Sequence, residues 1–356
     1  TMPETLLSLS KSNKFRVPFV QGKFNMGGSG ALRFCGENGL QVIITKRHPA
    51  LAKNESDPTG NNWAFTVIRR FAPTGNERSS SYRYLAPNGH VMNFSADALR
   101  IVPSKGSAPV AYCDDAKHGT FIKLFDYRAT PGNKSIVTTG MNYRLSTLLP
   151  ELALPVRVVE CRPYKGHTLD AKLQGLKTRV DSDRNGNIVS GYPTSSTIVV
   201  DGDQLDVSII AFDKSAKMNR WRSKEGIIFT VNGQKQGGID YRFFNRKAVN
   251  KSYLKDHLLL LVDCSAMKQV SHENLFMASR DRMRQGPLYN SIEKELEKLV
   301  KNHPGLRQLN EQYRQDKIKD NLNDSKPLAD VLKDLIKKVP TLASLLGLGH
   351  RLNSPT

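Results

Sequence analysis

The chain has 356 residues, enough for two or three domains with a sizeable core. Hydrophobic residues make up 38% of it, and no apolar run reaches the ~18 residues of a membrane-spanning helix, which excludes a membrane protein of that kind. The formal net charge of +20 favours polyanionic partners, nucleic acid before nucleotide, although high charge can also serve solubility alone.

A glycine-rich segment, Gln21–Gly30, lies near the start of the chain. Glycine has no Cβ, so the backbone N–H groups of such a segment can approach an anion closely. Residues 31–35 are expected to form a short helix that stops at Gly36, with the positive end of its dipole toward the anion. The segment therefore predicts a phosphate-binding loop. The alternative is a glycine turn without a ligand.

The segment does not fit the two commonest phosphate loops. Gly22, Gly27 and Ser29 match the P-loop spacing, but Gly28 stands where that loop needs its lysine. Pro18 interrupts the apolar residues before it, so no buried strand leads into the segment. The dinucleotide-binding pattern G-x-G-x-x-G is also missing.

Residues 1 to about 130 read as strands joined by loops. Apolar and β-branched residues predict strands at 40–45, 63–71 and 119–127, and Pro87–His90 has the composition of a hairpin turn. The stretch from Pro49 to Asn62 is predicted to be a loop.

Two of these segments together resemble the GHKL (Bergerat-fold) ATPases, the class of gyrase-type topoisomerases, heat-shock chaperones, histidine kinases and MutL-type repair proteins. Residues 6–14 and 19–34 look like the ATP lid of that family, and His118–Leu124 looks like its late strand with the motif GT-x-I-x-L. The resemblance implies ATP as the ligand, with Thr120 near the adenine. It also implies contacts to ATP from the lid residues Gly22, Lys23, Asn25, Met26, Gly27, Gly28, Ser29 and Gly30.

One part of the family pattern is missing from the sequence. The family's ATP site also uses a helix with a Glu and a Mg²⁺-binding Asn, and an Asp-x-Gly-x-Gly turn, both of which belong before the lid. Neither occurs ahead of Gly22. We therefore expect a fragment of a longer protein, with the Mg²⁺ ligand upstream of residue 1. We expect no ATP hydrolysis by these residues alone.

Residues 131–286 read as a second α/β region. A helix is predicted at 141–149, strands at 156–160, 197–200, 205–212, 226–231 and 258–262, and a helix near 246–254. Ile227–Gln234 resembles a strand and turn of the transducer domain of MutL-type proteins. That resemblance implies that Gln234 or Lys235 lies near the γ-phosphate; the alternative is an exposed hairpin tip.

The last part of the chain is predicted to be helical. Ser271 is expected to cap a helix that runs to Arg284. Further helices are expected at 288–301, from Pro304 onward, and at 327–338.

Two basic clusters are candidate phosphate contacts for nucleic acid, and a solvated surface is the alternative. They are Arg220 and Arg222 beside Trp221, and the trio Arg280, Arg282 and Arg284. Asp181–Gly186 matches the first half of a calcium loop, but Tyr192 replaces the glutamate at its twelfth position, so a turn is predicted. The four cysteines are scattered, which predicts buried thiols in a cytoplasmic protein and no metal site.

These observations predict an α+β protein in three parts. Residues 1–130 would form a partial Bergerat-type α/β sandwich, residues 131–286 a ribosomal-protein-like α/β transducer domain, and residues 287–356 a helical extension. The resemblance implies an ATP-gated homodimeric clamp or switch acting on nucleic acid in repair, topology control or anti-phage defence. The alternatives are a non-catalytic basic nucleic-acid-binding module and a chaperone-like ATPase acting on proteins.

Overall fold

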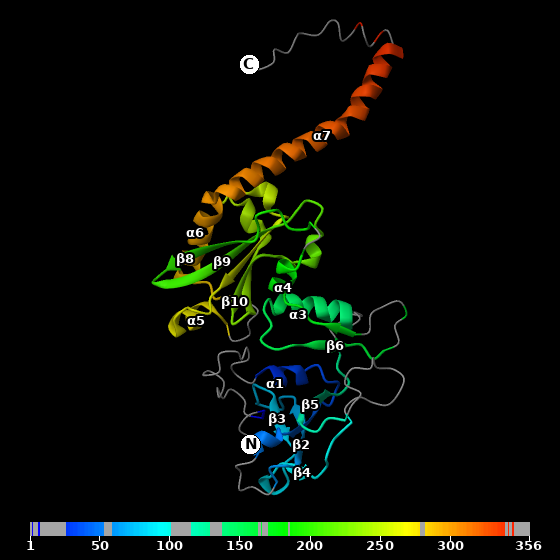
Figure 1. Ribbon diagram of the computed structural model, residues 1–356, viewed down its shortest axis with the longest axis vertical. Coiled ribbons are helices and arrows are strands. Elements are labelled where there is room, and N and C mark those ends of the chain that lie inside the picture. The colour runs from blue at the N-terminus through cyan, green and yellow to red at the C-terminus, as the bar shows by residue number, and fades with distance from the viewer. Residues whose placement is uncertain are drawn as a thin grey trace. The chain divides into compact units, whose positions relative to one another are not determined.

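The computed structural model (Figure 1) describes residues 2, 6–7, 26–52, 59–100, 115–128, 137–162, 165, 170–183, 186–277, 282–338, 341 and 344. Helices and open sheets are both present, which confirms the α+β class. The chain divides into two compact units. The first unit comprises residues 1–184, 229–236 and 263–265, and the second comprises residues 185–228, 237–262 and 266–356. The three predicted domains remain a prediction.

The first unit contains an antiparallel sheet with the strand order β3-β2-β1-β5, and a short strand β4 that also pairs with β2. The strands are β1 (Leu40–Lys46), β2 (Trp63–Phe71), β3 (Ser81–Tyr84), β4 (Met92–Phe94) and β5 (Gly119–Leu124). Helices α1 (Met26–Leu32) and α2 (Pro49–Ala52) and the 3₁₀ turn η1 (Pro87–Gly89) accompany them. The predicted strands at 40–45 and 63–71 are confirmed. Residues 87–89 form the turn η1, but the predicted hairpin is wrong, because the described strands β3 and β4 on either side of it both pair with β2. The helical turn α2 lies in the predicted loop.

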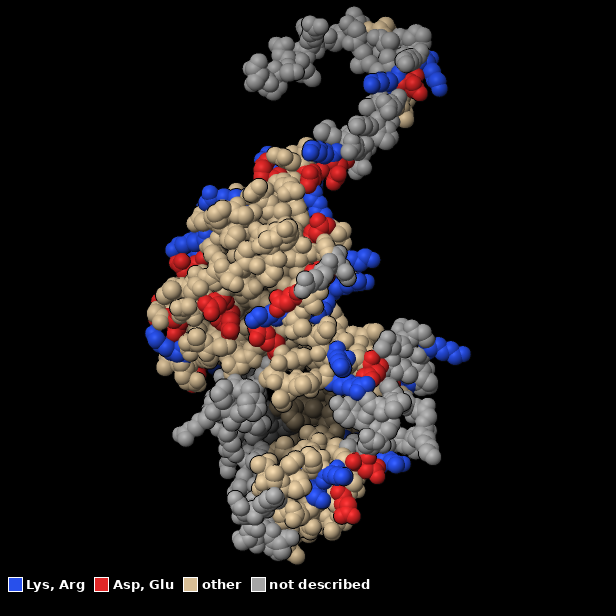
Figure 2. All heavy atoms as spheres, viewed as in Figure 1, with Lys and Arg blue, Asp and Glu red and all other residues tan. Residues whose placement is uncertain are grey.

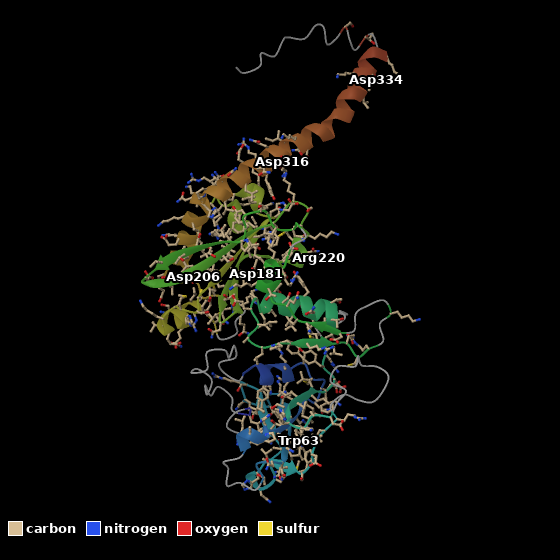
Figure 3. The ribbon with its side chains drawn as sticks, viewed as in Figure 1. Trp63, Asp181, Asp206, Arg220, Asp316 and Asp334 are labelled. Carbon is tan, nitrogen blue, oxygen red and sulfur yellow. The ribbon has the colours of Figure 1, made fainter. Side chains whose placement is uncertain are left out.

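The two faces of this sheet are packed differently. On one face, Ile43 and Ile68 form a small core with Leu32 of α1 and with Cys35. On the other face Trp63 is fully buried, and its Nε1 donates to the carbonyl oxygen of Ala96 at 3.1 Å (Figure 3). The glycines of α1, Gly27, Gly28 and Gly30, thus belong to the helix that packs through Leu32 on the Ile43 face of the sheet.

The rest of the first unit is built from short elements. The π-helical turn η2 (Val137–Met141) leads into α3 (Asn142–Leu148), and the strands β6 (Arg157–Val159) and β7 (Asp170–Lys172) pair antiparallel ahead of α4 (Leu176–Asp181). Arg157 and Asp170 form an ion pair across these two strands. The ion pair is diagonal, because Arg157 lies opposite Lys172 and Asp170 lies opposite Val159. Long side chains on paired strands can reach such diagonal neighbours.

A second sheet has the strand order β11-β10-β12-β9-β8. Its strands are β8 (Thr194–Val200), β9 (Asp203–Ala211), β10 (Glu225–Val231), β11 (Gln234–Asp240) and β12 (Leu258–Asp263). Strands β10 and β12 are apolar almost throughout, and their side chains are buried along nearly their whole length. A continuous apolar run of strand length is typical of a strand covered on both faces.

The expected helix near 246–254 is wrong. The 3₁₀ turn η4 (Tyr241–Asn245) precedes the segment, residues 246–249 form a bend and a turn, and η5 (Ser252–Leu254) is a second 3₁₀ turn. A third such turn, η3 (Met218–Arg220), precedes β10. Asn250 has φ of 55°, a left-handed conformation that an α-helix does not accommodate.

The C-terminal helices are α5 (Gln269–Leu275), α6 (Pro287–Asn302) and α7 (Pro304–Lys338). The helix expected up to Arg284 is too long, because the backbone becomes extended at Phe276, which bridges to Met283. Ser271 does not cap α5, since its hydroxyl bonds the carboxylate of Asp203. The separate helix expected at 327–338 is part of α7. Within the described residues no helix is long and apolar enough to cross a membrane.

Candidate nucleotide site

Residues 26–30 of the glycine-rich segment lie in a helix where a loop was expected. Helix α1 begins at Met26, so Gly27, Gly28, Ser29 and Gly30 lie inside it, and it ends at Leu32 rather than at residue 35. Leu32 is 1% exposed and fixes the helix to the sheet core. The other lid residues, Gly22, Lys23 and Asn25, lie outside the described residues.

The three glycines of α1 are not explained by packing. A Cβ added at Gly27, Gly28 or Gly30 would meet no described atom within 4 Å, and none of the three has a positive φ. Each glycine inside a helix costs roughly 0.5–1 kcal/mol relative to alanine. The three glycines thus lower the stability of this helix at positions where an alanine side chain would meet no described atom.

Thr120 lies on the same side of the sheet as α1. It faces Thr45 across the β1–β5 pairing, and the two hydroxyls share a hydrogen bond of 2.8 Å. Thr45 is two residues from Ile43 and therefore shares its face of the sheet, where Leu32 packs. Ile122, also on this face, is 52% exposed. The structure therefore brings the lid segment, a hydroxyl pair and an uncovered apolar side chain to one face.

The turn that carries Gln234 and Lys235 is held in place. Asn232 and Gly233 both have positive φ, which a tight hairpin turn requires, and β11 begins directly after them. Gly233 is packed so closely that a Cβ would lie 2.6 Å from the Cβ of Glu151. Gly233 is thus buried against Glu151, while Gln234 and Lys235 are partly exposed, so the turn is not a fully exposed tip. A role at the γ-phosphate stays a prediction.

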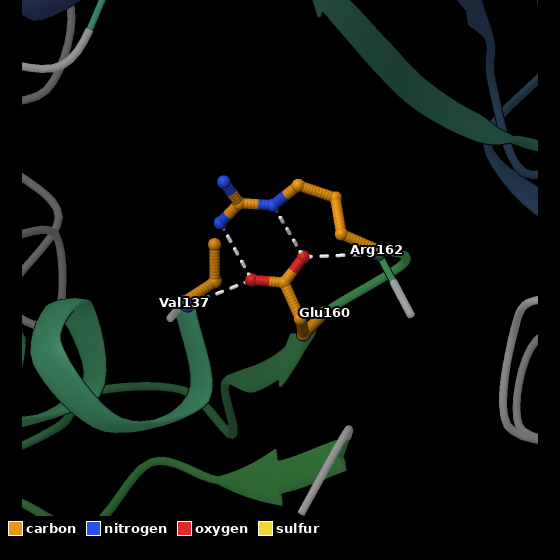
Figure 4. A network of polar contacts seen from close by, with 3 residues as sticks. All are labelled: Val137, Glu160 and Arg162. Atoms are coloured by element: carbon orange, nitrogen blue, oxygen red, sulfur yellow. Dashed lines mark hydrogen bonds and ion pairs between the residues drawn. The ribbon is translucent and has the colours of Figure 1, made fainter. Parts of the chain in front are cut away.

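A polar network of Glu160, Arg162 and Val137 holds the start of η2 against the end of β6 (Figure 4). Glu160 is 2% exposed, and its carboxylate accepts hydrogen bonds from the backbone N–H groups of Val137 and Arg162 and from the Arg162 guanidinium. Chiefly through the guanidinium bonds, this arrangement lowers the pKa of Glu160 to about 2. The network ties η2 to the end of β6 and holds the half-exposed Arg162 in one orientation.

The first basic cluster is largely structural. Arg222 is 4% exposed; its guanidinium donates to the carbonyl oxygen of Lys255 at 2.7 Å and lies 4.8 Å from the ring centre of Tyr241. The structure therefore gives Arg222 an anchoring role in place of the predicted phosphate contact. Arg220 is exposed on the loop before β10 (Figure 3).

The arginine trio does not lie on a helix as expected. Arg282 and Arg284 are exposed in the extended segment after α5, and Arg280 lies outside the described residues. Figure 2 shows basic and acidic side chains interspersed over β8–β10, so the positive charge is not gathered on that face.

The structure adds one pair that sequence reasoning missed. The rings of His48 and His118 stack edge to face with centroids 4.5 Å apart, because the ends of β1 and β5 meet there. Only the strand pairing could have revealed this contact. In the described part of the chain, no group of three His, Cys, Asp or Glu residues could hold a metal ion.

Comparisons with known proteins give little beyond this geometry. No protein-family model and no curated protein matches the sequence. Among solved structures, the B subunit of DNA gyrase from Myxococcus xanthus matches with a TM-score of 0.34 and 11% identity. The match covers 74% of this chain and 66% of that one, so the chain spans just under two thirds of the gyrase subunit. So low a TM-score carries no argument on function.

Proposed function

We propose that the chain is part of a GHKL-type ATPase that binds ATP on the α1 face of its first sheet and acts on nucleic acid. One observation carries the proposal: helix α1, in the lid-like segment, packs through Leu32 on the face of the sheet to which the late strand β5 contributes Thr120 and Ile122. The net charge of +20 supports a nucleic-acid partner.

Two features of the described residues on this face suit the base of a purine nucleotide. The Thr45–Thr120 hydroxyl pair can exchange hydrogen bonds with a base edge, and Ile122 offers apolar surface to its ring. The weak helix α1 can rearrange over the phosphates, with Lys23 as a cation. When bound, Mg²⁺ would neutralise phosphate charge, and its ligands would come from residues other than those described here.

The finer reading of the fold belongs to the same proposal. The first sheet would be the back of a Bergerat-type sandwich, the second sheet a transducer domain, and helices α6 and α7 its extension. ATP binding would then drive homodimerisation and close a clamp or switch.

The test is ATP binding by the full chain, measured with a fluorescent ATP analogue. Thr120→Val removes the hydroxyl at nearly constant volume and is expected to weaken binding about tenfold, the worth of one hydrogen bond. Thr197→Val, at an exposed position of β8, makes the same chemical change away from the site and should leave binding unchanged. Equal affinity in all three proteins, or no binding by the wild type, would contradict the proposal.

A separate assay distinguishes the alternative functions. A chaperone-like ATPase would bind ATP but not nucleic acid, and a non-catalytic nucleic-acid-binding module would bind nucleic acid but not ATP.

A further inference from the structure

The face of the first sheet that points away from α1 carries a row of side chains across four adjacent segments. Arg69 on β2 lies directly opposite Arg83 on β3 and, on its other side, opposite Leu40 on β1. Beyond Leu40, the backbone N–H of Phe125 donates to the Leu40 carbonyl oxygen. Residues directly opposite one another share a face, so the row runs unbroken across the sheet.

Two arginines facing each other across a strand pair are unfavourable by themselves. Like charges in this position destabilise a sheet by a few tenths to about 1 kcal/mol. Neither Arg69 nor Arg83 forms an ion pair with a described residue, and both are exposed. No acidic residue occupies this face of the described strands β1, β2, β3 and β5. A bound anion would relieve the repulsion.

Aromatic rings hold the cations over the sheet. The guanidinium carbons of Arg69 and Arg83 both lie 4.9 Å from the ring centre of Phe71, at the end of β2. Lys123, two residues before Phe125 on the same face, has its ammonium 5.0 Å from that ring, which is 36% exposed. Such cation–π contacts orient the charges while leaving their N–H groups toward solvent.

We propose that this surface, consisting of Arg69, Arg83 and Lys123 with Phe71 and Phe125, binds the phosphate backbone of a single nucleic-acid strand. The inference rests on the nucleic-acid partner of the proposed function, and it adds the contact surface. A guanidinium group can donate two parallel hydrogen bonds to two oxygens of one phosphate. Phe125 is the exposed ring of this surface, and an exposed aromatic ring beside cations is the usual platform for an unstacked base. A flat sheet face suits a single strand, because the grooves of a duplex admit a helix or a narrow ribbon.

The test measures how the full chain binds a labelled 20-nucleotide single-stranded DNA at several salt concentrations. Each lost phosphate contact lowers the slope of log affinity against log salt by about 0.7. Arg69→Gln/Arg83→Gln should therefore lower the slope by about 1.4, and Lys123→Gln by about 0.7. Removing the repulsion should leave the melting temperature of the double variant at or above that of wild type.

The matched control is Lys294→Gln/Lys319→Gln, which removes the same charge from exposed positions of α6 and α7. An unchanged slope in the double variant, or an equal fall of the slope in the control, would contradict the proposed binding surface. Either result would still be compatible with a nucleic-acid partner that binds elsewhere on the chain. A wild type that binds no DNA at low salt would contradict both this surface and the nucleic-acid part of the proposed function. ATP affinity should be the same in all of these variants.

Discussion

The two sheets differ in what their strands expose. Strands β10 and β12 bury nearly every side chain, and Phe229 and Leu260 are fully inaccessible. In the first sheet, β5 leaves Thr120 and Lys123 exposed on opposite faces, and Ile122 half exposed. Strands covered on both faces contribute stability, whereas the open faces of the first sheet leave polar and charged groups available to ligands.

The largest expected effect comes from truncating the buried sheet. Phe229→Ala should lower the free energy of unfolding by about 3–5 kcal/mol, because it leaves a cavity in a packed interior. Ile122→Ala, at an open position of β5, should change it by no more than about 0.5–1 kcal/mol. Chemical denaturation of both variants measures the contrast, and equal losses would show that the two sheets are packed alike.

A smaller loss is expected when the buried carboxylate of Glu160 is neutralised. Glu160→Gln removes the charge that holds two backbone N–H groups and a guanidinium, and should cost about 1.5–3 kcal/mol at neutral pH. Because glutamine has nearly the same size and shape as glutamate, the substitution leaves no cavity, and its effect is electrostatic rather than steric.

The pH dependence of this variant separates charge from packing. The pKa of Glu160 is lower in the folded protein, about 2, than the ordinary value near 4.3. The ionised carboxylate therefore stabilises the fold fully above that ordinary value, and the stabilisation is lost as the pH falls toward 2. Unfolding curves of wild type and Glu160→Gln should converge over this range. A constant difference from pH 7 to pH 2 would contradict the electrostatic account.

The smallest expected change in stability has the opposite sign. Gly30→Ala should stabilise the protein by about 0.5–1 kcal/mol, since the position is helical and a Cβ meets no described atom. If α1 must leave the helical conformation to cover ATP, the same variant should bind ATP more weakly. A rise in melting temperature with unchanged ATP affinity would assign α1 a purely structural role.

Some elements could be predicted because their signal is local. The strand at 63–71 has the bounds expected for it, since bulky apolar and β-branched residues fill it and polar turns flank it. Strand β11 has no such apolar pattern, because its sequence is Gln-Lys-Gln-Gly-Gly-Ile-Asp. Its glycines allow a close approach that no local pattern shows: a Cβ at Gly237 would lie 2.6 Å from the Cγ of Met283. Arg222 was misjudged for the same reason, because its burial depends on residues distant in sequence.

By itself, the sequence determined the α+β class, most strands, the excess of positive charge and the two segments that resemble an ATP lid and a late strand. Only the tertiary structure decided that α1 and Thr120 share a face, that Arg69 opposes Arg83, and that Glu160 is enclosed by its partners. The reason is physical. The alternation of apolar and polar side chains along a strand can be recognised from neighbouring residues. The register of paired strands and the faces that their side chains share depend on pairing between segments far apart in the chain.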